Sequence, residues 1–155
     1  MLLAIDSGNT NTVFAVYAGR EQRGAWRAVT NPGRTADEFA AWLSQLMSLQ
    51  EQKIADIDAA IISNVVPAAM FNLVTFCRRY LGFEPMIIGD PAIRLNIGVM
   101  MNNPEEVGAD RLVNAVGAHI AHPGPLVIID FGTATTFDVV DGDGNYRGGV
   151  IAPGV

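Results

Sequence analysis

Two segments far apart in the chain share one pattern of residue types. The first reads Ile5-Asp6-Ser7-Gly8-Asn9-Thr10, and the second reads Ile129-Asp130-Phe131-Gly132-Thr133-Ala134. In each, an apolar run ends in Asp, a Gly-centred turn rich in hydroxyl or amide side chains follows, and a β-rich run returns. Gly allows a sharp turn that brings backbone N–H groups to an anion. Because the Asp is placed to hold a cation that neutralises phosphates, the pattern predicts a polyphosphate site in two parts.

One such turn alone is weak support for phosphate binding, because Asp often caps its own backbone in an ordinary β-turn. Two copies in equivalent strand-turn-strand contexts are much harder to obtain by accident. The arrangement also differs from a P-loop, since a strand follows the turn and the Gly-Lys-Ser/Thr ending is absent. We therefore expect a nucleotide cleft between two homologous halves, each contributing one phosphate hairpin.

A third segment, Gly108-Ala109-Asp110-Arg111, opens a helix whose first apolar positions are Leu112 and Val113. An Asp in a first turn usually does no more than stabilise the helix dipole. It is also suited to accept a proton from an alcohol while metal ions carry the developing phosphoryl charge. Arg111 has two open interpretations: it contacts a substrate, or it pairs with Glu105 or Glu106.

The elements that must position these residues alternate between β and α patterns. Two β-rich runs around the first turn predict a hairpin. Thr35 and Glu38 form a capping-box sequence that opens one helix, and a second helix begins at Pro67 and stops at Gly82. These patterns indicate an α/β fold with a mixed sheet. The expected strands cover residues 2–6, 12–17, 24–30, 59–62 and 85–88.

The composition excludes several classes of function. Half of the 155 residues are apolar (50%), which is enough for a core without disulfide or metal staples. The net charge of −6, with no Lys/Arg-rich run, argues against nucleic acid or a membrane surface as a partner. No signal peptide or membrane span is recognisable, so we expect a soluble cytoplasmic protein. The single cysteine, Cys77, lies on an apolar helix face and is expected to be inert.

Four ordered motifs resemble those of type III pantothenate kinases, within the actin, Hsp70 and sugar-kinase superfamily. Besides the two hairpins they comprise residues 103–115 and Gly148-Gly149-Val150-Ile151-Ala152-Pro153-Gly154. The resemblance implies a ribonuclease H-like (actin-like ATPase) domain over 1–124 and the opening strands of an incomplete second homologous domain over 125–155. It further implies ATP-dependent phosphorylation of pantothenate to 4'-phosphopantothenate, the first step of coenzyme A biosynthesis. The implied enzyme is a cytoplasmic homodimer that needs Mg²⁺ and a monovalent cation, K⁺ or NH₄⁺.

The resemblance also implies roles for individual residues. Asp110 would be the catalytic base, within a pantothenate-binding segment made of Gly108, Ala109, Asp110 and Arg111. Asp130 would hold the monovalent cation, and Asp6 would serve the Mg²⁺–phosphate side. The residues implied to contact ATP are Asp6, Ser7, Gly8, Asn9, Thr10, Asn11, Thr12, Val13 and Thr133.

Some alternatives stay open at the level of sequence. Met101 stands where the family commonly has Tyr, so either a substrate-facing hydroxyl is missing there or Met101 is a packing residue. A non-catalytic nucleotide-binding or regulatory relative is the alternative function, and a filament or chaperone-type ATPase is a third. The two hairpins argue against the former, and Asp110-Arg111 argues against the latter. Because no helix follows residue 126, we expect the last strands to lack helical cover and to expose apolar surface.

Overall fold

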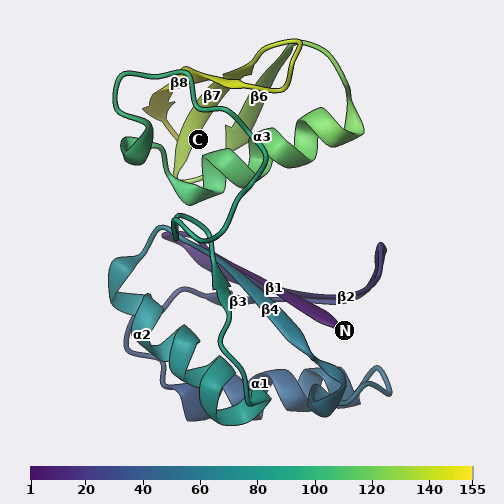
Figure 1. Cartoon of the computed structure of the whole chain (residues 1–155). Helices are drawn as coiled ribbons and strands as arrows, with labels where there is room; N and C mark the ends of the chain where they lie inside the picture. Colours follow the sequence, from purple (N-terminus) through teal and green to yellow (C-terminus); the bar gives the residue numbers. More distant parts are fainter. Residues whose placement is uncertain (155) are drawn as a thin grey trace. The chain divides into compact units, whose positions relative to one another are not determined.

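The computed structural model describes residues 1–154, which form two compact units: unit 1 covers Met1–Ile88 and unit 2 begins at Gly89. Each unit combines helices with one sheet (Figure 1), so the expected α/β class is confirmed.

Unit 1 is built on a mixed five-stranded sheet in the order β3-β2-β1-β4-β5. Strands β1 (Leu2–Ser7), β2 (Asn11–Ala18) and β3 (Glu21–Val29) form an antiparallel meander. Strand β4 (Ala59–Asn64) pairs parallel with β1, and β5 (Met86–Ile87) pairs parallel with β4. All five expected strands are present, and the expectation of a mixed sheet is confirmed.

Helix α1 (Ala36–Ser48) begins where the capping-box sequence predicts. The Glu38 N–H donates to the Thr35 hydroxyl at 3.3 Å, and the Thr35 N–H donates to the Glu38 carboxylate at 2.7 Å. These two bonds satisfy donors that a helix start otherwise leaves exposed. They also lower the pKa of the Glu38 carboxyl below its ordinary value, the backbone hydrogen bond having the larger effect.

Helix α2 (Pro67–Phe76) starts at its proline and continues into a π-helical turn at Cys77–Leu81. The N–H of Gly82 donates to the Cys77 carbonyl at 2.9 Å. Gly82 has a φ of 83°, a left-handed conformation that glycine adopts without steric cost. The predicted stop is therefore confirmed, whereas the π-helical turn has no sequence signal of its own.

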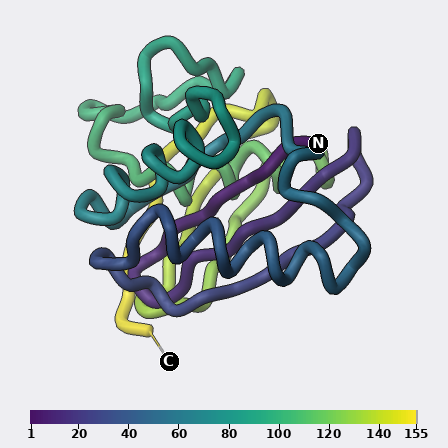
Figure 2. Tube along the Cα trace, turned by 90° about the horizontal axis from the view of Figure 1, so that it is seen from below, coloured from purple at the N-terminus to yellow at the C-terminus, as the bar shows by residue number. Residues whose placement is uncertain are grey.

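Both helices cover the same face of the sheet, as Figure 1 shows from the side and Figure 2 from below. The ring of Phe14 lies 5.4 Å from Phe39, 5.3 Å from Trp42 and 6.4 Å from Phe76, measured between centroids. Such tilted and edge-on aromatic contacts add to the burial of apolar area. This aromatic cluster joins β2 to both helices and fixes the sheet that carries the first hairpin.

Unit 2 contains helix α3 (Ala109–Ala121) and a three-stranded antiparallel meander of β6 (Leu126–Phe131), β7 (Ala134–Val140) and β8 (Tyr146–Pro153). Its strand order, β6-β7-β8, repeats the β1-β2-β3 order of unit 1. The repeat expected from the sequence is therefore a repeat of local topology as well.

The expectation that these last strands lack helical cover is wrong for one face. Helix α3 precedes them in sequence and packs on β6 and β7. Ala115 of α3, Val140 of β7 and Tyr146 of β8 form a small buried core there. The other face agrees with the expectation of exposed apolar surface, because alternate side chains of β6 point outward, with Val127 66% and Phe131 67% exposed.

The division into units differs from the boundary between homologous domains that the sequence suggests. Helix α3 lies before residue 125 yet belongs to unit 2, since its contacts are with β6 and β7. Compact units report packing and not ancestry, so the domains over 1–124 and 125–155 stay a prediction. Within residues 1–154, no helix is long and apolar enough to cross a membrane.

Candidate functional site

The first predicted phosphate hairpin is the turn between β1 and β2 in unit 1. The N–H of Gly8 donates to the Asn11 carbonyl at 3.0 Å and closes the turn. The hydroxyl of Thr30, just beyond β3, donates to the Gly8 carbonyl at 2.6 Å and lies 2.9 Å from the Thr12 hydroxyl. Thr12 lies in turn 3.3 Å from the Ser7 hydroxyl. The buried hydroxyls of Ser7 and Thr12 therefore brace the turn, while Asp6 is exposed at its entrance.

The second hairpin joins β6 to β7 in unit 2. The N–H of Gly132 donates to the Ala134 carbonyl at 3.0 Å, so this turn is also closed by its glycine, although the bond spans two residues where that of the first turn spans three. Neither Gly8 nor Gly132 has a positive φ, so the expected need for glycine's conformational freedom is not met in either turn. At Gly8 a side chain would instead approach the Asn11 carbonyl, since a Cβ would lie 3.3 Å from it. Gly8 is thus suited to its position by its lack of a side chain.

The predicted substrate segment forms the start of α3. Gly108 is the residue before the helix, with a φ of −58° that any residue adopts. Asp110 lies in the first turn, where its Oδ1 accepts the Arg111 N–H at 2.8 Å. This contact satisfies a helix N–H and corresponds to the ordinary role of an Asp at that position. Asp110 is half-buried.

Arg111 makes neither of the ion pairs considered from the sequence. Its Nε donates to Asp138 Oδ1 at 2.7 Å, and its Nη2 lies 2.6 Å from the same oxygen. Glu106 instead accepts a hydrogen bond from Asn103, and Glu105 is exposed. The pairing of Arg111 with Glu105 or Glu106 is therefore wrong, because a buried carboxylate on β7 lies closer than the acids that precede the helix.

Asp138 is buried, with 1% of its side chain exposed, and has a second partner in Tyr146 of β8. The Tyr146 hydroxyl donates to Asp138 Oδ1 at 2.6 Å, and the Arg111 guanidinium lies 5.9 Å from the centre of the Tyr146 ring. Burial and the Asp138 hydrogen bond raise the pKa of the Tyr146 phenol well above its ordinary value. Arg111, Asp138 and Tyr146 together form one group, the arginine cluster.

Asp130, predicted to hold a monovalent cation, is the second-last residue of β6. Its Oδ2 accepts a hydrogen bond from the Asn114 side chain at 3.1 Å. Asp130 is exposed, as are Thr133 in the following turn and Asp6 in unit 1. Hard cations bind carboxylate, carbonyl and water oxygens, and Mg²⁺ is commonly held by one or two carboxylates together with phosphates. The donors present at both hairpins fit such cations, although no three His, Cys, Asp or Glu side chains cluster within residues 1–154.

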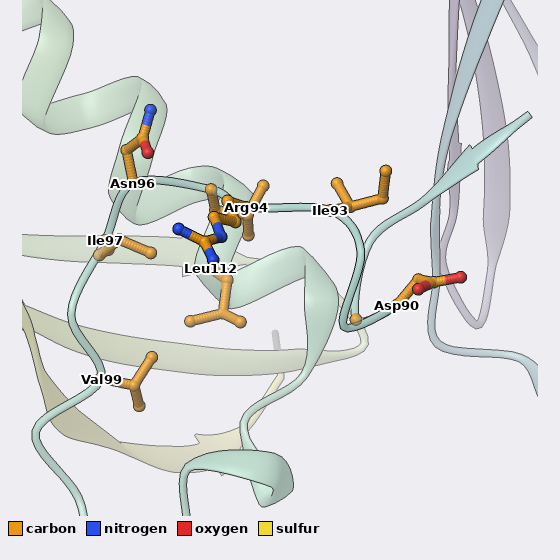
Figure 3. Close-up of a pocket in the computed structure, with 9 residues that line it drawn as sticks. Asp90, Ile93, Arg94, Asn96, Ile97, Val99 and Leu112 are labelled. Atoms are coloured by element: carbon orange, nitrogen blue, oxygen red, sulfur yellow. The ribbon is translucent and has the colours of Figure 1, made fainter.

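A cavity of about 430 Å³ lies in unit 2 between α3 and the segment that precedes it (Figure 3). Its volume suits a small organic molecule. Leu112, which lines it, directly follows Arg111 in the chain. The side chains that give the cavity its character are apolar Ile93, Ile97, Val99 and Leu112, with charged Asp90 and Arg94.

Two further residues have defined surroundings. The Met101 side chain is 40% exposed and lies beside Gly148, where a Cβ would be 3.7 Å from its sulfur. Met101 is therefore partly packed and partly exposed. Both interpretations stay open: a position that lacks a substrate-facing hydroxyl, or a packing residue. Cys77 is fully buried, and burial raises the pKa of its thiol to about 12. This agrees with an inert core cysteine, because the reactive form is the thiolate.

The structure distributes the predicted residues over two clusters. Asp6 to Val13 all lie on the hairpin of unit 1, whereas the α3 start, Asp130 and Thr133 lie in unit 2. Sequence reasoning missed the residues that bond the first turn, Arg111 and Asp130. A polar residue inside an apolar strand was the available signal at Asp138, whereas no local signal marked the other three: Thr30, Asn114 and Tyr146.

The chain has the fold of the actin-like ATPases and sugar kinases. A putative 2-dehydro-3-deoxygalactonokinase from Sinorhizobium meliloti matches with a TM-score of 0.55 at 12% sequence identity, over 97% of this chain and 53% of that one. At this identity the likeness shows the fold alone.

The chain belongs to the type III pantothenate kinase family, whose model matches residues 2–155. The type III pantothenate kinase of Rhodospirillum rubrum is 64% identical over 155 residues, and that of Paramagnetospirillum magneticum is 61% identical over the same length. Each match covers 100% of this chain. The chain spans 60% of the length of these relatives.

Proposed function

We propose that the protein transfers the γ-phosphoryl group of ATP to the primary hydroxyl of pantothenate, the first step of coenzyme A biosynthesis. The observation that carries this proposal is membership of the type III pantothenate kinase family over residues 2–155. Two glycine-closed turns that follow carboxylate-bearing strands support it, because phosphoryl transfer needs groups that hold phosphates and cations.

In the proposed mechanism Asp110 accepts the proton of the pantothenate hydroxyl through the oxygen that does not bond the Arg111 N–H. The hydroxyl oxygen forms a bond to the γ-phosphorus as the bond to the β–γ bridging oxygen breaks, and ADP leaves. Arg111 orients pantothenate, together with Gly108 and Ala109. Asp6 would hold Mg²⁺, whose chemistry there would be to neutralise the phosphate charge. The half-burial of Asp110 is compatible with this contact, because a fully buried carboxylate would not reach a substrate.

The ATP contacts are proposed on both turns. In unit 1 they comprise the residues Asp6 to Val13, on the turn that the Ser7 and Thr12 hydroxyls brace. In unit 2 they comprise Thr133. Asp130 is proposed to hold K⁺ or NH₄⁺ through the oxygens of its exposed carboxylate. A homodimer is proposed from the family alone, and light scattering on the purified protein tests it.

The test is a coupled ADP-release assay on a protein of the relatives' full length built on this chain. The wild type is expected to release ADP only when ATP, Mg²⁺ and pantothenate are all present. Asp110→Asn is expected to lower kcat by roughly 10²–10⁴ with the pantothenate KM within several-fold, since a general base acts mainly in the transition state. Glu105→Gln, which changes an exposed acid of the same unit, is the matched control.

Two outcomes contradict the proposal. A near-wild-type kcat in Asp110→Asn would show that another group takes the proton. ATP binding without turnover of pantothenate by the wild type would favour the non-catalytic nucleotide-binding relative.

A further inference from the structure

We propose that Asp138 and Tyr146 are positioning residues that hold the Arg111 guanidinium in a fixed orientation at the start of α3. The kinetic consequence of this inference rests on the proposed function, in which Arg111 contacts pantothenate. Neither Asp138 nor Tyr146 is expected to touch the substrate, because Asp138 is 1% exposed and Tyr146 is fully buried.

The arginine cluster draws one residue from each of three elements. Arg111 comes from α3, Asp138 from β7 and Tyr146 from β8. A single oxygen, Asp138 Oδ1, receives the Arg111 Nε bond at 2.7 Å and the Tyr146 hydroxyl bond at 2.6 Å. Asp138 Oδ2 has no hydrogen-bond partner among the residues that the structure describes. The charge of Asp138 is therefore balanced chiefly by Arg111, which makes the orientation of the guanidinium a strong requirement of the fold.

The glycine pair that opens the last motif gives an independent reason to regard this cluster as a built arrangement. A Cβ on Gly149 would collide with the Phe137 carbonyl and with the Arg111 guanidinium, and would lie 2.6 Å from Asp138 Oδ1. Gly148, its neighbour, has a φ of 111° that disfavours any side chain. Strand β8 thus approaches the ion pair so closely that only glycine fits over it.

A fixed guanidinium is an advantage for recognising a small polar substrate. An unrestrained Arg loses rotamer entropy when it binds, whereas an Arg held beforehand has already lost it on folding. Asp138 contacts only the Nε and Nη2 edge, so Nη1 takes no part in this pair. The planar fork can therefore be held at one edge and still carry donors at another.

The kinetic test is a double-mutant cycle between Arg111→Lys, which keeps a cation beside the buried Asp138 carboxylate but removes the guanidinium fork, and Asp138→Asn in the protein of full family length. Asp138→Asn alone is expected to raise the pantothenate KM by about 10- to 100-fold, because misplacing an orienting group by about 1 Å can cost on the order of 10². The KM for ATP should stay within about twofold. In the Arg111→Lys background, Asp138→Asn should change the pantothenate KM by no more than about twofold, since its effect passes through the guanidinium of Arg111.

Tyr146→Phe is the second variant. It keeps the buried ring and removes only the hydroxyl, so it should disturb the folding of unit 2 far less than Asp138→Asn does. It should raise the pantothenate KM in the same direction and by less than Asp138→Asn. Asp143→Asn, an exposed acid on the turn that precedes β8, is the matched control and should leave both KM values unchanged. Equal increases in KM with and without Arg111 would overturn the inference, since they would mean that Asp138 acts on the fold generally.

A spectroscopic readout on the 155-residue chain separates this inference from the proposed function. The Arg111 Nε–H resonance should be protected from solvent exchange in the wild type and should lose that protection in Asp138→Asn. An unprotected Nε–H in the wild type would refute the positioning role even if the enzyme phosphorylates pantothenate. A protected one in a protein that does not phosphorylate pantothenate would refute the proposed function alone.

Discussion

Removal of Arg111 should destabilise unit 2 severely, and the size of the loss follows from its partner. Asp138 is 1% exposed, and without Arg111 its Oδ1 keeps only the Tyr146 hydrogen bond while Oδ2 has none. Leaving one member of a buried ion pair without the other costs about 3–5 kcal/mol. A unit of this size has a total stability of only about 3–10 kcal/mol. Arg111→Ala should therefore leave much of unit 2 unfolded or close to unfolding.

Replacement of the whole arginine cluster should be far milder than removal of Arg111. In the triple variant Arg111→Met, Asp138→Leu, Tyr146→Phe, no charge or hydroxyl of the cluster is left buried without a partner. Buried ion pairs replaced by apolar residues of similar volume are often neutral in stability, within about 1–2 kcal/mol. The matched control is Arg147→Ala, since Arg147 is 54% exposed and lies 3.7 Å from Asp141, a surface pair that contributes about 0–1 kcal/mol.

The assay is native-state hydrogen exchange on the 155-residue chain, comparing amides of β7 with amides of β1. Both tryptophans, Trp26 and Trp42, lie in unit 1, so their fluorescence should report an unchanged transition in every variant. The β7 amides should lose about 3–5 kcal/mol of protection in Arg111→Ala and recover most of it in the triple variant. A loss in Arg111→Ala below about 1 kcal/mol, or a triple variant as unstable as the single one, would refute the reasoning.

Two further predictions concern the hairpin carboxylates and pH. In the protein of full family length, Asp130→Asn should shift potassium activation to higher concentration while Asp6→Asn should not, and unchanged potassium dependence in both variants would contradict the division of roles. The pKa of the Tyr146 phenol is raised from its ordinary value of 10.0 by burial first and by Asp138 second, so the neutral form is favoured in the folded state. The stability that the neutral phenol contributes is complete below about pH 10 and falls as the pH rises toward the raised pKa. Denaturant titrations at about pH 8 and 10.5 measure this loss. It should be seen in the control Tyr17→Phe, which keeps the Tyr146 phenol, and should be smaller in Tyr146→Phe, which lacks it.

The elements were predictable where their signals are local. The Thr35 and Glu38 capping box, Pro67 at a helix start and Gly82 at a helix end are each satisfied by residues a few positions away. The repeated hairpin was visible for the same reason, since a strand, a turn and a returning strand occupy one short stretch. What these signals specify is the existence and type of an element.

The residues that hold the candidate site were not predictable because their partners are distant in sequence. Asp138 lies 27 positions from Arg111, and Thr30 lies 22 positions from the Gly8 carbonyl that it bonds. From the sequence alone, Glu105 and Glu106 were the nearest acids to Arg111 after its neighbour Asp110. Arg111 pairs with neither of them, because both are exposed to water, whereas the buried Asp138 carboxylate needs a cation beside it. The cover of β6 and β7 by α3 was missed because it comes from a helix that precedes them.

The same meander is held in different ways in the two units, and this has a consequence for the site. In unit 1 the sheet is covered by two helices around the Phe14 cluster, so the first hairpin rests on apolar contacts that are insensitive to charge. In unit 2 a single helix covers the sheet, and besides the small Ala115 core two polar contacts hold it there: Arg111 with Asp138, and Asn114 with Asp130. A change of charge at any of these residues acts on the position of α3 as well as on chemistry. Loss of activity in an Arg111 variant is therefore interpretable only beside a measurement of the stability of unit 2.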